Sequence, residues 1–283
     1  MEQISGMTIA CLGISAAVCV VLPLAVMLVF QRKTKAEWFP LLGGMVAYLF
    51  FIMMLEQIFH MICLGTDNSL SEAISGSPWL YAAYLSVTAA LFEEGARYLV
   101  FLVLYKKDRG RECAVTFGVG FTLVETVTVL MTILGMLSVA MAIRDGGIDA
   151  YLSAVPPEEL TEAETAVREF MATNPASFFL PILERICALL TSVGCSILVA
   201  ASILRKNASF FVGALGLHML QNVLSSLYQA EIVTQLPVIE IGLTAGAVLI
   251  AWIGWKIYCK LPESPEKKEP DRPQPQRKYR KMY

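Results

Sequence analysis

The chain has 283 residues, of which 56% are hydrophobic and 16% are charged. Soluble domains average roughly 45–50% apolar and about 25% charged residues, so this composition excludes an ordinary soluble protein. The formal net charge is −2, and we expect the chain to have a lipid bilayer and no nucleic acid among its partners.

Long apolar runs follow one another along the sequence. A helix that crosses a membrane needs about 20 mostly apolar residues. Seven runs reach this length, at 7–30, 38–65, 79–105, 113–143, 178–204, 208–228 and 236–258. The sequence therefore predicts an all-α, polytopic membrane helix bundle with about seven transmembrane helices.

The basic residues gather in every second connection between these runs and in the tail. They are Arg32, Lys33 and Lys35, then Lys106, Lys107, Arg109 and Arg111, then Arg205 and Lys206, and finally eight Lys and Arg after Tyr258. Cytoplasmic loops are rich in Lys and Arg, so this alternation predicts an N-terminus outside the cytoplasm and a C-terminus inside it. Residues 1–260 then form the transmembrane domain.

The outer loop 144–177 belongs to that domain. It carries seven carboxylates, and Leu160, Ala163, Val167 and Phe170 recur at helical spacing. This pattern predicts a short amphipathic helix on the outer surface, as a lid, a substrate platform or a plain connector.

The tail 261–283 has a different composition. It is rich in Pro, Glu, Lys and Arg and has almost no apolar residues. Such a segment buries too little apolar surface to offset its ordering entropy, so we predict a disordered basic tail in the cytoplasm.

The run at 79–105 carries Glu93, Glu94 and Arg97 near its middle. Charged groups in the hydrocarbon core are costly, and they usually face the bundle interior and mark a functional site. Glu93 and Arg97 lie four residues apart and can form an ion pair, which leaves Glu94 in need of another partner. Neighbouring carboxylates suit general acid–base chemistry, and an ion-paired helix contact is the structural alternative.

Other runs supply polar residues that we expect to support this site. They are Glu125, which follows Gly118 and Gly120, the pair Glu184-Arg185, His218 with Asn222, and Glu56 with His60. The two glycines allow close approach of another helix. The sequence predicts that the charged groups of the third to sixth runs converge near the middle of the membrane.

A metal site is one interpretation of these residues. Histidine and carboxylates bind zinc, and a catalytic zinc has three protein ligands. The candidate ligands are His218, Glu94 and Glu125, although a histidine in a membrane bundle also forms hydrogen bonds between helices. Zinc and a metal-free site both remain open, and the seven cysteines show no C-x-x-C spacing that suggests a disulfide framework or a cysteine zinc site.

In this order, the motifs resemble those of the YhfC family of intramembrane metalloproteases, which is similar to the type II CAAX prenyl proteases and the PrsW proteases. The resemblance runs from Glu56 to Asn222. It rests on Leu55-Glu56-Gln57-x-x-His60, Phe92-Glu93-Glu94-x-x-Arg97-Tyr98, Gly118-Val119-Gly120 before Glu125, Glu184-Arg185 before Ser196, and His218-x-x-x-Asn222. The activity that it implies is peptide-bond hydrolysis within or beside the membrane.

The resemblance also implies catalytic roles. Glu93 would be the base that activates a water molecule, and Glu94 and Arg97 would orient it. His218 and Asn222 would hold the negative charge that develops on the substrate oxygen. The substrate would be a membrane-associated peptide or protein.

Two positions depart from the family pattern. The fourth run has Phe121 where the pattern Gly-x-Gly-His places a histidine, and the fifth has Ser192 where the pattern places a histidine eight residues after the Glu of Glu-Arg. Losing general-base assistance costs about 10²–10⁴ in rate. Impaired catalysis is therefore part of the prediction.

Three functions follow from the sequence. The first is an intramembrane endopeptidase, and the second is a catalytically degenerate scaffold that binds a partner protein or a substrate. The third is a small-molecule transporter, since charge pairs at mid-membrane depth also mark translocation paths. The basic loops and the resemblance favour a bacterial cytoplasmic membrane.

Overall fold

The computed structural model describes residues 4–66, 68–106 and 110–263, and over these residues the chain forms helices and no strand. The predicted all-α class is confirmed, because each apolar run is helical. The corresponding elements are α1 (Gly6–Thr34), α2 (Phe39–Ala47) with η1 (Tyr48–Glu56) and α3 (Gln57–Leu64), α5 (Pro78–Leu104), α6 (Glu112–Gly146), η2 (Pro175–Phe179) with α9 (Leu180–Leu204), α10 (Ser209–Gln229) and α11 (Leu236–Tyr258).

Six of these spans are long and apolar enough to cross a membrane. The exception is α5, which has 27 residues but carries Glu93, Glu94 and Arg97. These charged side chains find partners within the bundle, as described below. The chain is therefore an integral membrane protein of the polytopic helical class, with α5 as the seventh span that the sequence predicts.

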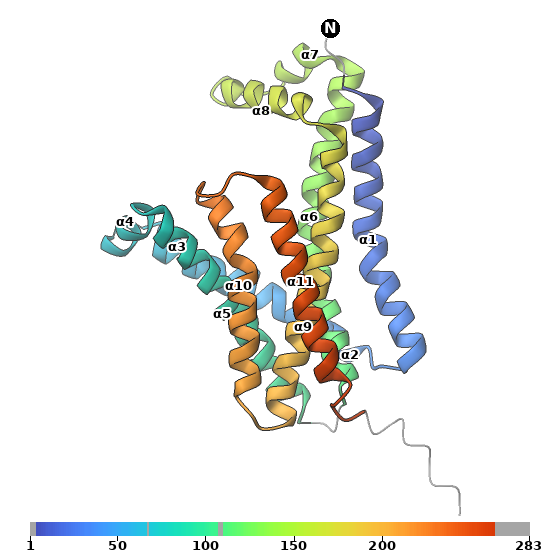
Figure 1. Cartoon of the computed structure of the whole chain (residues 1–283). Helices are drawn as coiled ribbons and strands as arrows, with labels where there is room; N and C mark the ends of the chain where they lie inside the picture. The colour runs from blue at the N-terminus through green and yellow to red at the C-terminus, as the bar shows by residue number, and fades with distance from the viewer. Residues whose placement is uncertain (1–3, 67, 107–109, 264–283) are drawn as a thin grey trace, which may run out of the picture.

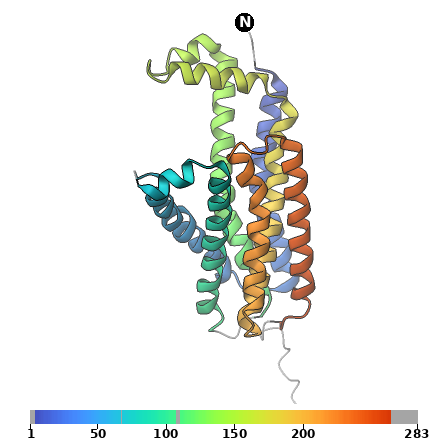
Figure 2. The same ribbon diagram turned by 60° about the vertical axis from the view of Figure 1, so that its left-hand side comes forward.

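Helix α9 is the central element of the bundle. It packs against α1, α5, α6, α10 and α11. Figure 1 shows α1, α6, α9 and α11 running side by side, with α5 and α10 as neighbours on one flank. In Figure 2 the helices α5, α10 and α11 stand next to one another in front of the longer α6. This arrangement brings charged residues of α5, α6, α9 and α10 toward one region.

Glycine allows the close approach of α6 to two neighbours. A Cβ atom at Gly120 would lie 2.1 Å from the carbonyl oxygen of Leu41 in α2. A Cβ atom at Gly118, on another face of α6, would lie 2.9 Å from the Cα of Val193 in α9. The interpretation of these glycines as sites of close helix approach is confirmed.

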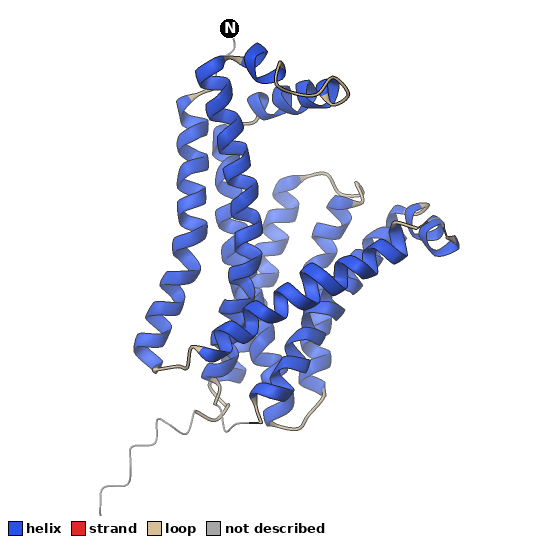
Figure 3. Cartoon of the chain, turned by 180° about the vertical axis from the view of Figure 1, so that it is seen from behind, coloured by secondary structure: helices blue, strands red, loops and turns tan. Residues whose placement is uncertain are grey.

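The span Phe39–Leu64 differs in its backbone from the other spans. Its middle segment η1 is a π-helix, a conformation that is rare and often occurs near functional sites. Figure 3 shows the span crossing the back of the bundle obliquely, toward the short α4 (Ser69–Ser75). The segment η1 places the ring of Tyr48 edge-on against Phe121, with 5.0 Å between the ring centroids.

The outer loop forms α7 (Ile148–Leu152) and α8 (Leu160–Ala172), so the predicted helix is confirmed. Figure 1 shows α8 lying across the end of the bundle, nearly perpendicular to α6. Val167 is the buried residue of α8, and Phe170 packs against Phe178, with 5.4 Å between the ring centroids. A role as lid or substrate platform stays a prediction.

The two ends of the described chain lie at opposite ends of the bundle. Figure 1 places the N-terminal end beside α7 and α8, and the C-terminal end of α11 at the far end. This placement fits an odd number of crossings, whereas the side that faces the cytoplasm stays a prediction. The tail predicted to be disordered lies outside the described residues from 264 onward.

Candidate active site

Arg97 joins the two glutamates of α5. Its side chain is fully buried, and its Nη1 donates to Glu94 Oε1 at 2.8 Å. Its Nη2 donates to Glu93 Oε2 at 2.9 Å. The spacings of three and four residues place all three side chains on one face of α5. The predicted Glu93–Arg97 pair is confirmed, and Glu94 shares the same guanidinium group.

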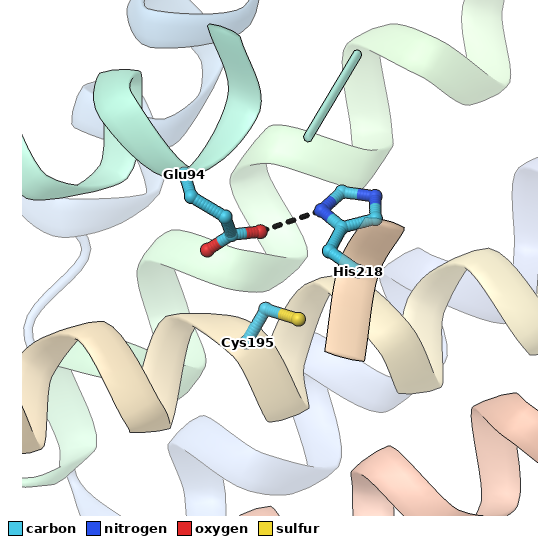
Figure 4. Close-up of side chains that lie close together, drawn as sticks. All are labelled: Glu94, Cys195 and His218. Atoms are coloured by element: carbon cyan, nitrogen blue, oxygen red, sulfur yellow. Dashed lines mark hydrogen bonds and ion pairs between the residues drawn. The ribbon is translucent and has the colours of Figure 1, made fainter. Parts of the chain in front are cut away.

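His218 of α10 completes the group on α5. Its Nδ1 lies 2.6 Å from Glu94 Oε1, as Figure 4 shows. An ionised carboxylate only accepts hydrogen bonds, so Nδ1 carries the proton of this contact. The other ring nitrogen, Nε2, lies 3.8 Å from Glu93 Oε1. Glu94 therefore fixes the orientation of the imidazole ring and turns Nε2 toward Glu93.

A cavity of about 350 Å³ opens beside Glu93 and His218. Seven of the ten residues predicted for the site line it: Glu93, Arg97, Glu125, Glu184, Arg185, His218 and Asn222. Glu94 is fully buried and contacts His218 from behind. Charged groups from α5, α6, α9 and α10 converge on this cavity, whereas their depth in the membrane stays a prediction. Glu93, His218 and Asn222 all contribute to the wall of this cavity.

Glu125 of α6 has its own partner in the cavity wall. Arg185 of α9 donates from Nη1 to Glu125 Oε1 at 2.7 Å. Both side chains are largely removed from solvent, with 29% of Glu125 and 10% of Arg185 exposed. This ion pair links α6 to α9. It also occupies Glu125, one of the three metal ligands that the sequence suggests.

The two positions that depart from the family pattern both contact Arg97. The guanidinium carbon of Arg97 lies 4.2 Å from the ring centroid of Phe121, a cation–π contact. Arg97 Nη2 donates to Ser192 Oγ at 3.3 Å, and Ser192 Oγ donates to the carbonyl oxygen of Gly118 at 3.0 Å. Phe121 and Ser192 thus hold Arg97 in place from two further helices.

Glu56 and His60 do not line the cavity, although Glu56 is buried near enough to Glu93 and His218 to interact with their charges. The residues described as lining the cavity include neither of them. His60 Nε2 is 3.5 Å from Glu56 Oε1, and His60 Nδ1 is 2.7 Å from the hydroxyl oxygen of Tyr84. The hydrogen bond to Tyr84 holds His60 near the start of α5, well before Glu93 in that helix. His60 therefore does not bring a second imidazole to the cavity.

Comparison with known proteins bears on these residues. The model of the YhfC intramembrane metalloprotease family matches residues 18–243, which is most of the chain. The chain belongs to this family. It is 26% identical over 254 residues to the uncharacterized membrane protein YhfC of Bacillus subtilis (strain 168), and the match covers 89% of this chain and 97% of that relative. No solved structure matches the chain.

The family description implies a metal ion, and the donor atoms of the chain test that implication. Among the described residues, one group of three possible ligands gathers: Glu94, Cys195 and His218, with donor atoms within 4.8 Å of one another (Figure 4). Glu94 and Cys195 are fully buried. Catalytic zinc keeps a coordination position open to water, which this closed group does not provide. Glu94 Oε2 is buried and has no hydrogen-bond partner among the described residues.

The cavity side of the site offers fewer donors. Glu93 Oε1 and His218 Nε2 face each other there, whereas the two positions at which the resemblance leads us to expect histidines hold Phe121 and Ser192. The guanidinium of Arg97 lies against Glu93, and its positive charge opposes the binding of a second cation. A catalytic zinc has three protein ligands. The described residues therefore do not fit a catalytic metal, and we derive no reaction step through one.

Sequence reasoning missed two residues of the site. Cys195 is one of seven cysteines in or beside apolar runs, and their spacing resembles no metal-binding motif. It lies beside Glu94 because of the way α9 packs against α5, which the sequence does not specify. Glu240 near the start of α11 lines the cavity and is 8% exposed. A signal for Glu240 existed, because it is an ionisable residue within an apolar run.

Proposed function

We propose that this chain is an endopeptidase that cleaves membrane-associated peptides or proteins in a bacterial cytoplasmic membrane, with Glu93 as the base. The observation that carries the proposal is the meeting of Glu93, His218 and Asn222 at one polar cavity inside an apolar bundle. Family membership supports the reaction class. The location rests on the basic loops and on the relative from Bacillus subtilis.

In the proposed reaction, Glu93 takes a proton from a water molecule while the water oxygen attacks the carbonyl carbon of the peptide bond. Glu93 is 22% exposed, which leaves it accessible from the cavity. The charge that develops on the carbonyl oxygen is stabilised by Asn222 and by His218 in its imidazolium form, in which Nε2 also carries a proton and can donate to the oxyanion. Glu93 then delivers its proton to the leaving nitrogen as the carbon–nitrogen bond breaks. Arg97 and Glu94 position Glu93 and His218 through the contacts described above.

The test is cleavage by the purified protein in liposomes. A library of synthetic membrane-associated peptides is added, and new termini are identified by mass spectrometry. We expect Glu93→Gln to lower the cleavage rate by about 10²–10⁴, because it removes the base. The matched control is Glu162→Gln, a substitution on the exposed surface of α8. Equal cleavage by the wild type and Glu93→Gln contradicts the proposal.

A second candidate function is a non-catalytic binding protein. The observation that favours it is the pair of contacts from Phe121 and Ser192 to Arg97, which fill the family's histidine positions with structural side chains. In that case the wild type cleaves no peptide. Partner binding in the cavity then persists in Glu93→Gln.

A further inference from the structure

The cavity contains two kinds of carboxylate. Glu93 pairs with Arg97, and Glu125 pairs with Arg185. Glu184 of α9 and Glu240 of α11 also line the cavity. Within the described residues, neither of these two has a hydrogen bond or an ion pair.

Glu240 is the more informative of the two. Glu240 is 8% exposed, and it lines the cavity. A carboxylate removed from bulk water without a partner is costly, and such groups in a membrane bundle mark binding sites. Helices α9 and α11 pack against each other, and the charge of Glu184 acts on Glu240 across this contact, so the two carboxyl groups lie near one another in the cavity wall. A positively charged ligand group offsets that cost.

We propose that Glu184 and Glu240 bind the positively charged side chain of a lysine or arginine in the peptide substrate. The inference rests on the proposed endopeptidase function, since the bound residue lies in the same cavity as Glu93 and therefore near the bond to be cleaved. An ammonium or guanidinium group forms charge-assisted hydrogen bonds to carboxylates, which are stronger than neutral ones. The long apolar stems of these side chains suit an apolar bundle.

The surroundings favour an organic cation over a metal ion. In the part of the chain that is described, the group of three metal donors is Glu94, Cys195 and His218, and it includes neither Glu184 nor Glu240. Tyr228 and Gln229 line the cavity as well and add hydrogen-bonding atoms. A volume of about 350 Å³ accommodates a long side chain together with part of the peptide backbone.

The experiment compares two blocked peptides that differ at one residue, lysine or the uncharged norleucine of similar length. Binding is measured on the full chain in detergent in the Glu93→Gln background, so that neither peptide is consumed. We expect the lysine peptide to bind about tenfold more tightly, the effect of one charge-assisted contact. Glu240→Gln is expected to remove this preference. The matched control is Glu231→Gln, because Glu231 is exposed in the connection between α10 and α11.

Cleavage of the same two peptides by the chain with Glu93 intact separates this inference from the proposed function. Cleavage without preference for lysine, together with equal binding of both peptides, overturns the cation site and leaves the endopeptidase in place. Preferential lysine binding that depends on Glu240, without any cleavage, supports the cation site and overturns the endopeptidase. A preference for lysine that survives in Glu240→Gln also overturns the site.

Discussion

Arg97 is the residue that organises the candidate site. It is fully buried, and it holds Glu93, Glu94 and Ser192 by hydrogen bonds while its guanidinium rests on Phe121. A planar guanidinium can serve several acceptors at once, which a lysine ammonium does less well. The geometry of both glutamates therefore depends on one side chain.

Removing that side chain should destabilise the protein. Arg97→Gln leaves buried carboxylates without their cation, and breaking a buried ion pair typically costs about 3–5 kcal/mol. The control is Arg144→Gln, whose pair with Asp145 is exposed, and such pairs contribute about 0–1 kcal/mol. The measurement is unfolding in mixed detergent. Equal unfolding midpoints for the two variants would show that Arg97 is not the organising residue.

The donor atoms lead to a prediction about metals. Because no third metal donor clusters with Glu93 and His218 among the described residues, peptide cleavage should be insensitive to a zinc chelator. The purified protein should contain far less than one zinc per chain by elemental analysis. Loss of cleavage on chelation, restored by added zinc, would contradict the metal-free mechanism. His218→Ala then serves as the control for specific zinc binding.

The sequence identifies the charged residues of the site, but it does not identify the residues that contact them. Charges within apolar runs identify Glu93, Arg97 and His218, because such residues face the bundle interior. The contacts of Arg97 with Phe121 and Ser192 depend on helix packing, which periodicity does not specify. An apolar phenylalanine and a small serine look like ordinary core residues in the sequence.

At the scale of the elements, glycines allow α6 to pack closely against α2 and α9. Gly120 lets it approach the backbone of α2. Gly120→Ala places a methyl group 2.1 Å from the carbonyl oxygen of Leu41, and the backbone has to move. Overpacking of this kind costs about 1–3 kcal/mol.

The same helix provides the control for that substitution. A Cβ atom at Gly135 meets nothing within 4 Å, so Gly135→Ala should be neutral or slightly stabilising. Thermal unfolding of both variants in detergent measures the difference. If the Gly120→Ala protein is as stable as the Gly135→Ala protein, the close contact of α2 with α6 does not contribute to stability, which contradicts the prediction.

The elements themselves follow from the sequence to a large extent. All seven apolar runs are helical, with ends within a few residues of the predicted ones, because run length and polar flanks define a span. The π-helix η1 was not predicted. Every residue of η1 before Glu56 is apolar or aromatic, so a change from 3.6 residues per turn leaves no trace in the hydrophobic pattern.

At the scale of the whole molecule, the predicted orientation has a natural reporter. Cys259 is the exposed cysteine after α11, and the other six are buried. A membrane-impermeant maleimide should label Cys259 in inside-out vesicles and not in intact cells, because the positive-inside rule places this end in the cytoplasm. Thr161→Cys in a Cys259→Ser background should show the opposite pattern. Reversed labelling of both sites would invert the orientation.

The buried charges of α5 have a consequence for biosynthesis. A charged residue at the centre of a helix raises the apparent cost of membrane insertion by about 2.5–3.5 kcal/mol. The charged side chains of α5 find three partners outside that helix, and these belong to helices that the ribosome makes later: Phe121 of α6, Ser192 of α9 and His218 of α10. Helix α5 therefore becomes stable in the membrane only after α9 and α10 have been inserted. A nascent chain that stops before α10 should remain a substrate for membrane quality control.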